Sequence, residues 1–148
     1  YLHRSGILHL DLKPSNMVVD AGRLRVLDLS HARPPGACPA GFGTAEYMPP
    51  EQLVGDRVSE ASDVFGLGGV LYRAATRGRP YAATDRARDP YKSPPMRALR
   101  RRLPDELGAL IAGCLDPRTA ARPTTTEVRQ RLEKLAGVDG SGPGRKDR

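Results

Sequence analysis

The chain has 148 residues, enough for one domain with a real hydrophobic core. It carries a net charge of +7, yet its arginines are scattered and only 5% of its residues are aromatic, which argues against a nucleic-acid partner. No apolar run reaches about 18 residues, so no membrane span is expected in this segment, although a longer parent protein could carry an anchor elsewhere. Cys38 and Cys114 lack metal-ligand spacing, which favours reduced thiols and a cytoplasmic location.

The beginning of the chain predicts a helix end followed by a hairpin. Residues 1–6 are typical of the tail of a helix that ends at Gly6. Residues 17–19 and 24–27 are short apolar runs around the turn sequence Asp-Ala-Gly-Arg, which predicts two antiparallel strands. In this pairing Val19 lies near Leu24.

Four polar residues gather around this hairpin. Asp11, Lys13 and Asn16 lie in the sequence His-Leu-Asp-Leu-Lys-Pro-Ser-Asn at 9–16, which Pro14 keeps out of a helix. The predicted pairing brings Asn16 beside Asp28, because paired backbones lie about 5 Å apart. An amide oxygen and a carboxylate oxygen suit Mg²⁺, which takes one or two protein ligands and completes its shell with phosphate and water. The alternative, a polar loop beside an ordinary hairpin, does not account for all four groups.

The middle of the chain predicts a loop and then a buried helix. Residues 30–42 lack apolar periodicity and are rich in proline, which indicates a mobile loop. A helix is expected to open at Ser62 or Asp63, both suitable N-caps, and to end at Gly78. It is apolar nearly all round, and its interior glycines indicate close approach of neighbouring segments.

Two amphipathic helices are expected near the end of the chain. From Pro104, apolar residues recur at helical spacing and include Cys114, which we interpret as inert packing. Thr124 and Glu127 form a capping-box sequence for a last helix that turns Val128, Leu132 and Leu135 inward. Residues 79–95 are expected to be irregular. Residues 96–103 could form a short basic helix, which we interpret as a solvated face in preference to a dock for acidic substrates.

Several separated motifs together resemble the eukaryotic-type serine/threonine protein kinases. The stretch at 9–16 followed by Asp28 is similar to their pattern H-R-D-x-x-x-x-N and D-F-G. The resemblance implies that Asp11 accepts the proton of the substrate hydroxyl and that Lys13 steadies the transferring phosphoryl group. It also implies that Asn16 and Asp28 hold Mg²⁺ (or Mn²⁺) on ATP. A lysine two residues after the catalytic acid is typical of the serine/threonine class.

The same resemblance assigns supporting roles to five residues. The motif Gly-Thr-Ala-Glu-Tyr-Met-Pro-Pro-Glu at 43–51 is similar to the segment that ends in A-P-E, and it implies that Thr44 positions the substrate near Asp11 and Lys13. It further implies structural roles for His9 as a buried anchor, for Asp63 as acceptor of the loop backbone, and for a buried ion pair between Glu51 and Arg122.

Two positions depart from the family pattern. Leu10 replaces the arginine that normally couples the catalytic acid to a phosphorylated activation loop, so control by loop phosphorylation is in doubt. Ser30 replaces the D-F-G glycine, which has more freedom in φ, so switching of this segment is also in doubt. Neither change removes a metal ligand or the catalytic acid.

The resemblance covers residues 1–136 and corresponds to the C-terminal lobe of the kinase fold, an α+β fold that is mainly helical here with a short hairpin. Residues 137–148 are expected to be a disordered glycine-rich basic tail. We expect a protein kinase that phosphorylates serine or threonine, with arginine richness that reflects GC-rich coding, as in actinobacteria-like genomes. The missing N-terminal lobe is an expected partner, and these residues alone are expected to be inactive.

Two other functions stay open at this point. The first is a non-catalytic, pseudokinase-like interaction module, which the changes at Leu10 and Ser30 favour. The second is a small-molecule phosphotransferase, which shares the loop pattern but typically lacks Lys13 and the pair formed by Glu51 and Arg122.

Overall fold

The computed structural model describes residues 1–82, 85, 88–89 and 103–137. The basic helix predicted at 96–103 and the tail predicted at 137–148 lie outside these residues, apart from Leu103 and Gly137. No helix in the described part of the chain is long and apolar enough to cross a membrane.

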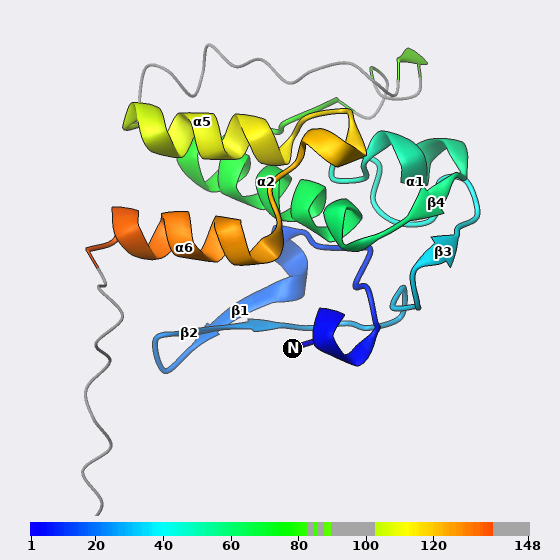
Figure 1. Cartoon of the computed structure of the whole chain (residues 1–148), viewed down its shortest axis with the longest axis horizontal. Coiled ribbons are helices and arrows are strands. Elements are labelled where there is room, and N and C mark those ends of the chain that lie inside the picture. The colour runs from blue at the N-terminus through cyan, green and yellow to red at the C-terminus, as the bar shows by residue number, and fades with distance from the viewer. Residues whose placement is uncertain (83–84, 86–87, 90–102, 138–148) are drawn as a thin grey trace, which may run out of the picture.

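Three α-helices form the body of the fold (Figure 1). Helix α2 (Glu60–Thr76) packs against both α5 (Asp105–Cys114) and α6 (Thr125–Leu135), and α5 and α6 also contact each other. Between α2 and α5 lies a core of Phe65, Tyr72, Tyr81, Ile111 and Leu115. A second cluster joins α2 and α5 to α6 through Val64, Leu110, Cys114 and Val128. The predominantly helical architecture predicted from the sequence is therefore present.

The hairpin predicted at the start of the chain is confirmed in its register. Strands β1 (Met17–Asp20) and β2 (Arg23–Val26) pair antiparallel, with Val19 opposite Leu24 as expected. Ala21 and Gly22 make the two-residue turn, with φ of 48° and 74°, as the favoured hairpin turn requires. The apolar side chains of this hairpin stay largely exposed; Val19 is 72% exposed and Leu24 59%.

Short elements connect these larger parts. The chain begins with a 3₁₀-helix, His3–Ser5, which ends at Gly6 in the left-handed conformation, so the predicted stop is correct although the element is not an α-helix. Further 3₁₀ turns span Pro14–Asn16 and Thr119–Ala121. Helix α1 covers Pro50–Val54.

A two-residue strand pair, β3 (Gly36–Ala37) with β4 (Arg57–Val58), was not predicted. Strand β3 lies within the segment expected to be a mobile loop, where the backbone of Arg33 also bridges to Leu8.

The predicted start and end of α2 were both wrong. The N-cap is Ser59, which forms a capping box with Ser62, so Ser62 and Asp63 lie inside the first turn. Both side chains bond residues far away in sequence, which local patterns do not reveal. The helix ends at Thr76, and its C-cap in the left-handed conformation is Arg77 (φ 58°), one residue before the expected Gly78.

The prediction that the glycines of α2 permit close approach is confirmed. A Cβ atom built on Gly68 would lie 2.7 Å from the Cβ of Cys114, and one on Gly69 would lie 2.9 Å from the ring of Tyr47. Cys114 is fully buried, and burial raises the pKa of its thiol to about 11, as expected for inert packing. The capping box of Thr124 and Glu127 at the start of α6 is also confirmed.

Replacing Gly68 with alanine should therefore destabilise the protein, because the new methyl group overlaps α5. We expect a loss of about 1–3 kcal/mol in the free energy of unfolding, measured by chemical denaturation. Gly108→Ala on α5 is the matched control: nothing lies within 4 Å of its Cβ position, so alanine should stabilise by up to about 1 kcal/mol. Equal effects of the two changes would contradict the packing described here.

Candidate active site

The loop at residues 9–16 is held by one carboxylate of helix α2. Asp63 is buried, and its two oxygens accept the backbone N–H groups of His9 and Leu10, each at 2.8 Å. Leu10 adopts a left-handed conformation (φ 61°), which points these two consecutive N–H groups toward the same carboxylate. The His3 ring adds a third contact to Asp63 at 2.7 Å. The expected bonding of Asp63 to the loop backbone is present.

His9 links the loop to the end of strand β2. Its side chain is buried; Nδ1 accepts the N–H of Asp11 at 3.2 Å and Nε2 donates to the carbonyl of Leu27 at 3.1 Å. These partners correspond to the neutral tautomer with its proton on Nε2. The expected place of His9, a buried anchor without a free ring nitrogen, agrees with this geometry.

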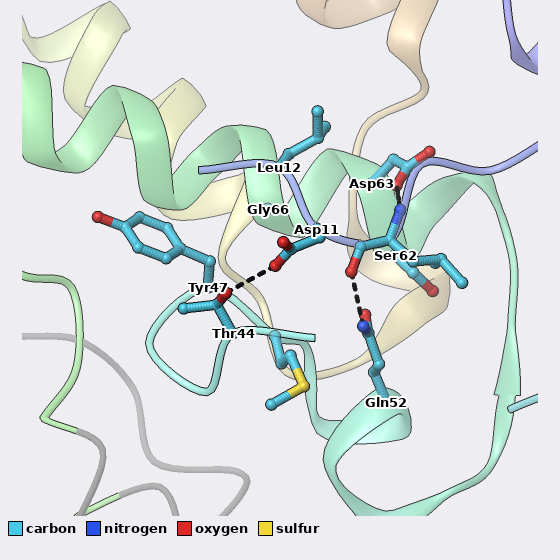
Figure 2. Close-up of a pocket in the computed structure, with 10 residues that line it drawn as sticks. Asp11, Leu12, Thr44, Tyr47, Gln52, Ser62, Asp63 and Gly66 are labelled. Carbon is cyan, nitrogen blue, oxygen red and sulfur yellow. Dashed lines mark hydrogen bonds between the residues drawn. The ribbon is translucent and has the colours of Figure 1, made fainter. Parts of the chain in front are cut away.

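Asp11 is the centre of the polar set. The Thr44 hydroxyl donates to Oδ1 at 2.7 Å, as Figure 2 shows, and the Lys13 ammonium lies 2.6 Å from Oδ2. Lys13 also donates to the Thr44 hydroxyl at 2.8 Å, so the three side chains form a closed network. Burial on its own would raise the pKa of Asp11, but the bonds from Lys13 and Thr44 outweigh it and hold that pKa below its ordinary value. The carboxylate is therefore ionised at neutral pH.

Asn16 and Asp28 provide the oxygens expected for a metal ion. Asn16 is buried, and its amide nitrogen donates to the Asp11 carbonyl and carboxylate, so these bonds do not use its side-chain oxygen. The Asn16 carbonyl accepts the N–H of Leu27 at 2.8 Å, which places Asp28 next in the chain beside it. Asp28 is exposed, and bonds from Ser30 lower its pKa, so it is ionised.

This pair of oxygens fits a divalent metal bound together with phosphates. One amide oxygen and one ionised carboxylate are hard ligands of the kind and number that Mg²⁺ takes from proteins. Asp28 has a positive φ of 62°, a conformation that few non-glycine residues adopt and that aspartate tolerates better than most. Among the described residues, no three histidine, cysteine or acidic side chains gather into a separate metal site.

The pair between Glu51 and Arg122 is present and buried. The Arg122 side chain lies 2.7 Å and 2.9 Å from the two oxygens of Glu51 in a bidentate contact. Ser62 donates a further hydrogen bond to Glu51 at 2.8 Å. This pair joins helix α1, just after the segment that carries Thr44, to the first turn of α2 and to the segment before α6.

Three residues of the site were missed from the sequence. Gln52, 1% exposed, donates its amide to the carbonyls of Leu10 and Phe42, and thereby connects the loop at 9–16 to the segment at 30–42. His3 contacts Asp63, and His31 lies 4.0 Å from Asp11 Oδ2. Gln52 follows the A-P-E-like motif directly, after Glu51, and this position is the one sequence signal for its place in the site.

Leu10 packs where the family pattern has an arginine. It is 4% exposed and forms an apolar cluster with Leu8, Cys38 and Val58, against which Phe42 also packs. The segment at 30–42 thus contacts the loop through apolar side chains. This agrees with the doubt, raised from the sequence, about coupling through a phosphate.

Comparison with known proteins assigns the chain to a family. The model of the protein kinase domain matches residues 1–132, and the chain belongs to this family. It is 39% identical over 142 residues to "Probable serine/threonine-protein kinase PkwA" of Thermomonospora curvata, a match that covers 88% of this chain and 18% of that protein. It is 33% identical over 154 residues to serine/threonine-protein kinase AfsK of Streptomyces coelicolor, covering 95% of this chain and 19% of AfsK.

A third relative is serine/threonine-protein kinase PknA of Mycobacterium tuberculosis, 38% identical over 86 residues, which cover 54% of this chain and 20% of PknA. The chain thus spans about a fifth of the length of the curated relatives it matches. These relatives support the predicted resemblance to bacterial serine/threonine kinases. The roles of individual residues in phosphoryl transfer stay predictions.

Removing one partner of the buried pair should strongly destabilise the protein. We expect Arg122→Met to cost about 3–5 kcal/mol of unfolding free energy, because it leaves Glu51 charged and buried without its partner. Arg118→Met is the matched control, since Arg118 pairs with Asp116 at the surface and its side chain is 79% exposed. A thermal or denaturant midpoint of Arg122→Met equal to that of the control would contradict this role.

The contact between His3 and Asp63 should make stability depend on pH. The hydrogen bond that the His3 ring donates to the Asp63 carboxylate raises the pKa of His3 despite partial burial, and Glu60 adds to the shift while the N-terminal amine opposes it. A raised pKa in the folded state stabilises the protein fully below the unfolded value of about 6.5, and this stabilisation is lost as pH rises through the folded pKa.

His3→Gln should therefore cost more unfolding free energy at pH 5.5 than at pH 9, as measured by urea denaturation. The difference between wild type and variant is the informative quantity, because it cancels the titration of other groups. A difference that stays constant between the two pH values would show that His3 is not charged against Asp63.

Proposed function

We propose that this chain is the C-terminal, catalytic lobe of a serine/threonine protein kinase that transfers the γ-phosphoryl group of ATP to a protein hydroxyl. The observation that carries the proposal is the convergence of Lys13, Asn16 and Thr44 on the buried, ionised carboxylate of Asp11. Family membership of residues 1–132 supports it. The lobe would comprise residues 1–136, with residues 137–148 as a disordered tail.

In this proposal Asp11 receives the proton of the acceptor hydroxyl. Its lowered pKa keeps the carboxylate ready to accept at neutral pH, and the bonds of Thr44 and Asn16 orient its two oxygens. An incoming hydroxyl would replace one of these bonds at Asp11. Lys13, whose ammonium contacts Asp11, would place its positive charge beside the phosphoryl group in transfer.

The cofactors in the proposal are ATP and Mg²⁺ (or Mn²⁺). Asn16 and Asp28 would hold the metal, and Lys13 would contact the nucleotide. A metal bound there supplies positive charge that offsets the negative charge of the phosphates. The proposed compartment is the cytoplasm, which agrees with two buried cysteines that form no disulfide.

The proposed partners are a protein substrate and an N-terminal kinase lobe. Exposed apolar side chains of the hairpin and the following residues support the second, since Val19, Leu24 and Leu29 are 72%, 59% and 54% exposed. A covering lobe would bury them and complete the nucleotide site. For that reason we propose that the 148 residues alone do not transfer phosphate.

Asp11→Asn tests the proposal in the protein at its full natural length. We expect phosphorylation of a serine-containing substrate with Mg²⁺ and ATP to fall by about 10²–10⁴-fold, because the amide cannot take the proton. Asp105→Asn, an exposed acid on α5, is the control and should retain activity.

Two results would contradict the proposal. One is activity in Asp11→Asn equal to that of the control. The other is a wild-type protein of full length that transfers no phosphate, which would favour the non-catalytic interaction module that Leu10 and Ser30 suggest.

A further inference from the structure

A polar hollow opens beside Asp11 and is not used by the mechanism above. It has a volume of about 330 Å³, and its walls include Lys13, Thr44, Glu46, Arg73 and Arg79. Lys13 and Thr44 both bond the carboxylate of Asp11, so the hollow adjoins the proposed acceptor site. A peptide extends about 3.3 Å per residue, so a chain that presents a hydroxyl to Asp11 places its neighbouring side chains here.

The charges that line the hollow do not balance. Lys13 pairs with Asp11, and Arg79 pairs with Glu46 across the opening. Arg73 lies on α2, and its side chain has no hydrogen bond or ion pair within the described part of the chain. Among the described residues the lining thus has three cations (Lys13, Arg73, Arg79) and one acid (Glu46). Asp11, which lies outside the lining, pairs with Lys13, so one positive charge stays unpaired.

The unpaired positive charge belongs to Arg73, whose position strengthens its interaction with an incoming charged group. Arg73 is half-buried, so solvent and salt screen its charge less than they screen an exposed arginine. A guanidinium offers a planar set of donors that a carboxylate can accept in pairs. A basic side chain in the same place would be repelled and would find only Glu46, which Arg79 already occupies.

We propose that this hollow receives a glutamate or aspartate side chain of the acceptor protein, and that Arg73 is the residue that selects it. The inference rests on the proposed kinase function and deepens it by naming the substrate class: serine or threonine hydroxyls with an acidic residue nearby in the sequence. Arg73 acts on substrate choice and takes no part in the transfer of the proton or the phosphoryl group.

The test uses the protein at its full natural length and peptides with one serine acceptor. Each flanking position, from three before to three after the serine, carries glutamate, alanine or arginine in turn. At the preferred position we expect kcat/KM for glutamate to exceed that for arginine at least tenfold in wild type. Arg73→Glu should reverse this ratio, and Arg73→Gln, which keeps size and polarity, should bring it close to one.

Arg77→Glu is the matched control, because Arg77 is exposed, ends the same helix and does not line the hollow. It makes the same change in net charge and should leave the ratio as in wild type. A second measurement, fluorescence anisotropy of labelled glutamate and arginine peptides, reports binding without any need for catalysis. It should show the same dependence on Arg73.

The outcomes separate this inference from the function on which it rests. If the protein phosphorylates the peptides and both Arg73 variants keep the wild-type ratio of kcat/KM between glutamate and arginine peptides, the inference is wrong and the kinase function is retained. Absence of phosphorylation, with binding of the glutamate peptide that depends on Arg73, would support the acidic subsite and overturn the kinase function. Absence of both phosphorylation and Arg73-dependent binding would overturn both the kinase function and the acidic subsite.

Discussion

The contact of Asp63 with the backbone of the loop at 9–16 is the constraint on which the site depends. Two consecutive N–H groups, of His9 and Leu10, donate to one buried carboxylate that is part of the long helix α2. The Gln52 amide adds a bond to the carbonyl of Leu10, so both backbone polar groups of Leu10 are held by buried side chains. The place of Asp11, one residue further on, follows from them.

A second buried charge shows why the rest of the fold holds together around this loop. The five N–H donors of Arg122 all have acceptors: the two oxygens of Glu51 and the carbonyls of Ala61, Asp116 and Pro117. Its guanidinium also lies 4.9 Å from the centre of the Phe65 ring. A desolvated charge is tolerated when all its donors have acceptors. Here the guanidinium of Arg122 joins four separate segments in one network.

Sequence reasoning succeeded where the pattern is local. The hairpin register followed from two apolar runs around a turn, and the capping box of Thr124 and Glu127 from residues three apart. It failed at the start of α2, because Ser62 and Asp63 look like caps but bond Glu51 and the loop. It also missed the contacts of Gln52 and His3, whose partners lie 42 and 60 residues away.

The sequence by itself determined the three long helices, the hairpin, the acidic, basic and amide groups of the site, and the family to which they point, because each depends on residue types at short spacing. Only the tertiary structure decided which groups meet. It set Thr44 and Lys13 against Asp11, and left the Arg73 side chain, among the described residues, without an ion-pair partner in the hollow beside them. The physical reason is that charge balance and burial depend on all the segments packed at one place, and the sequence carries no local record of that packing.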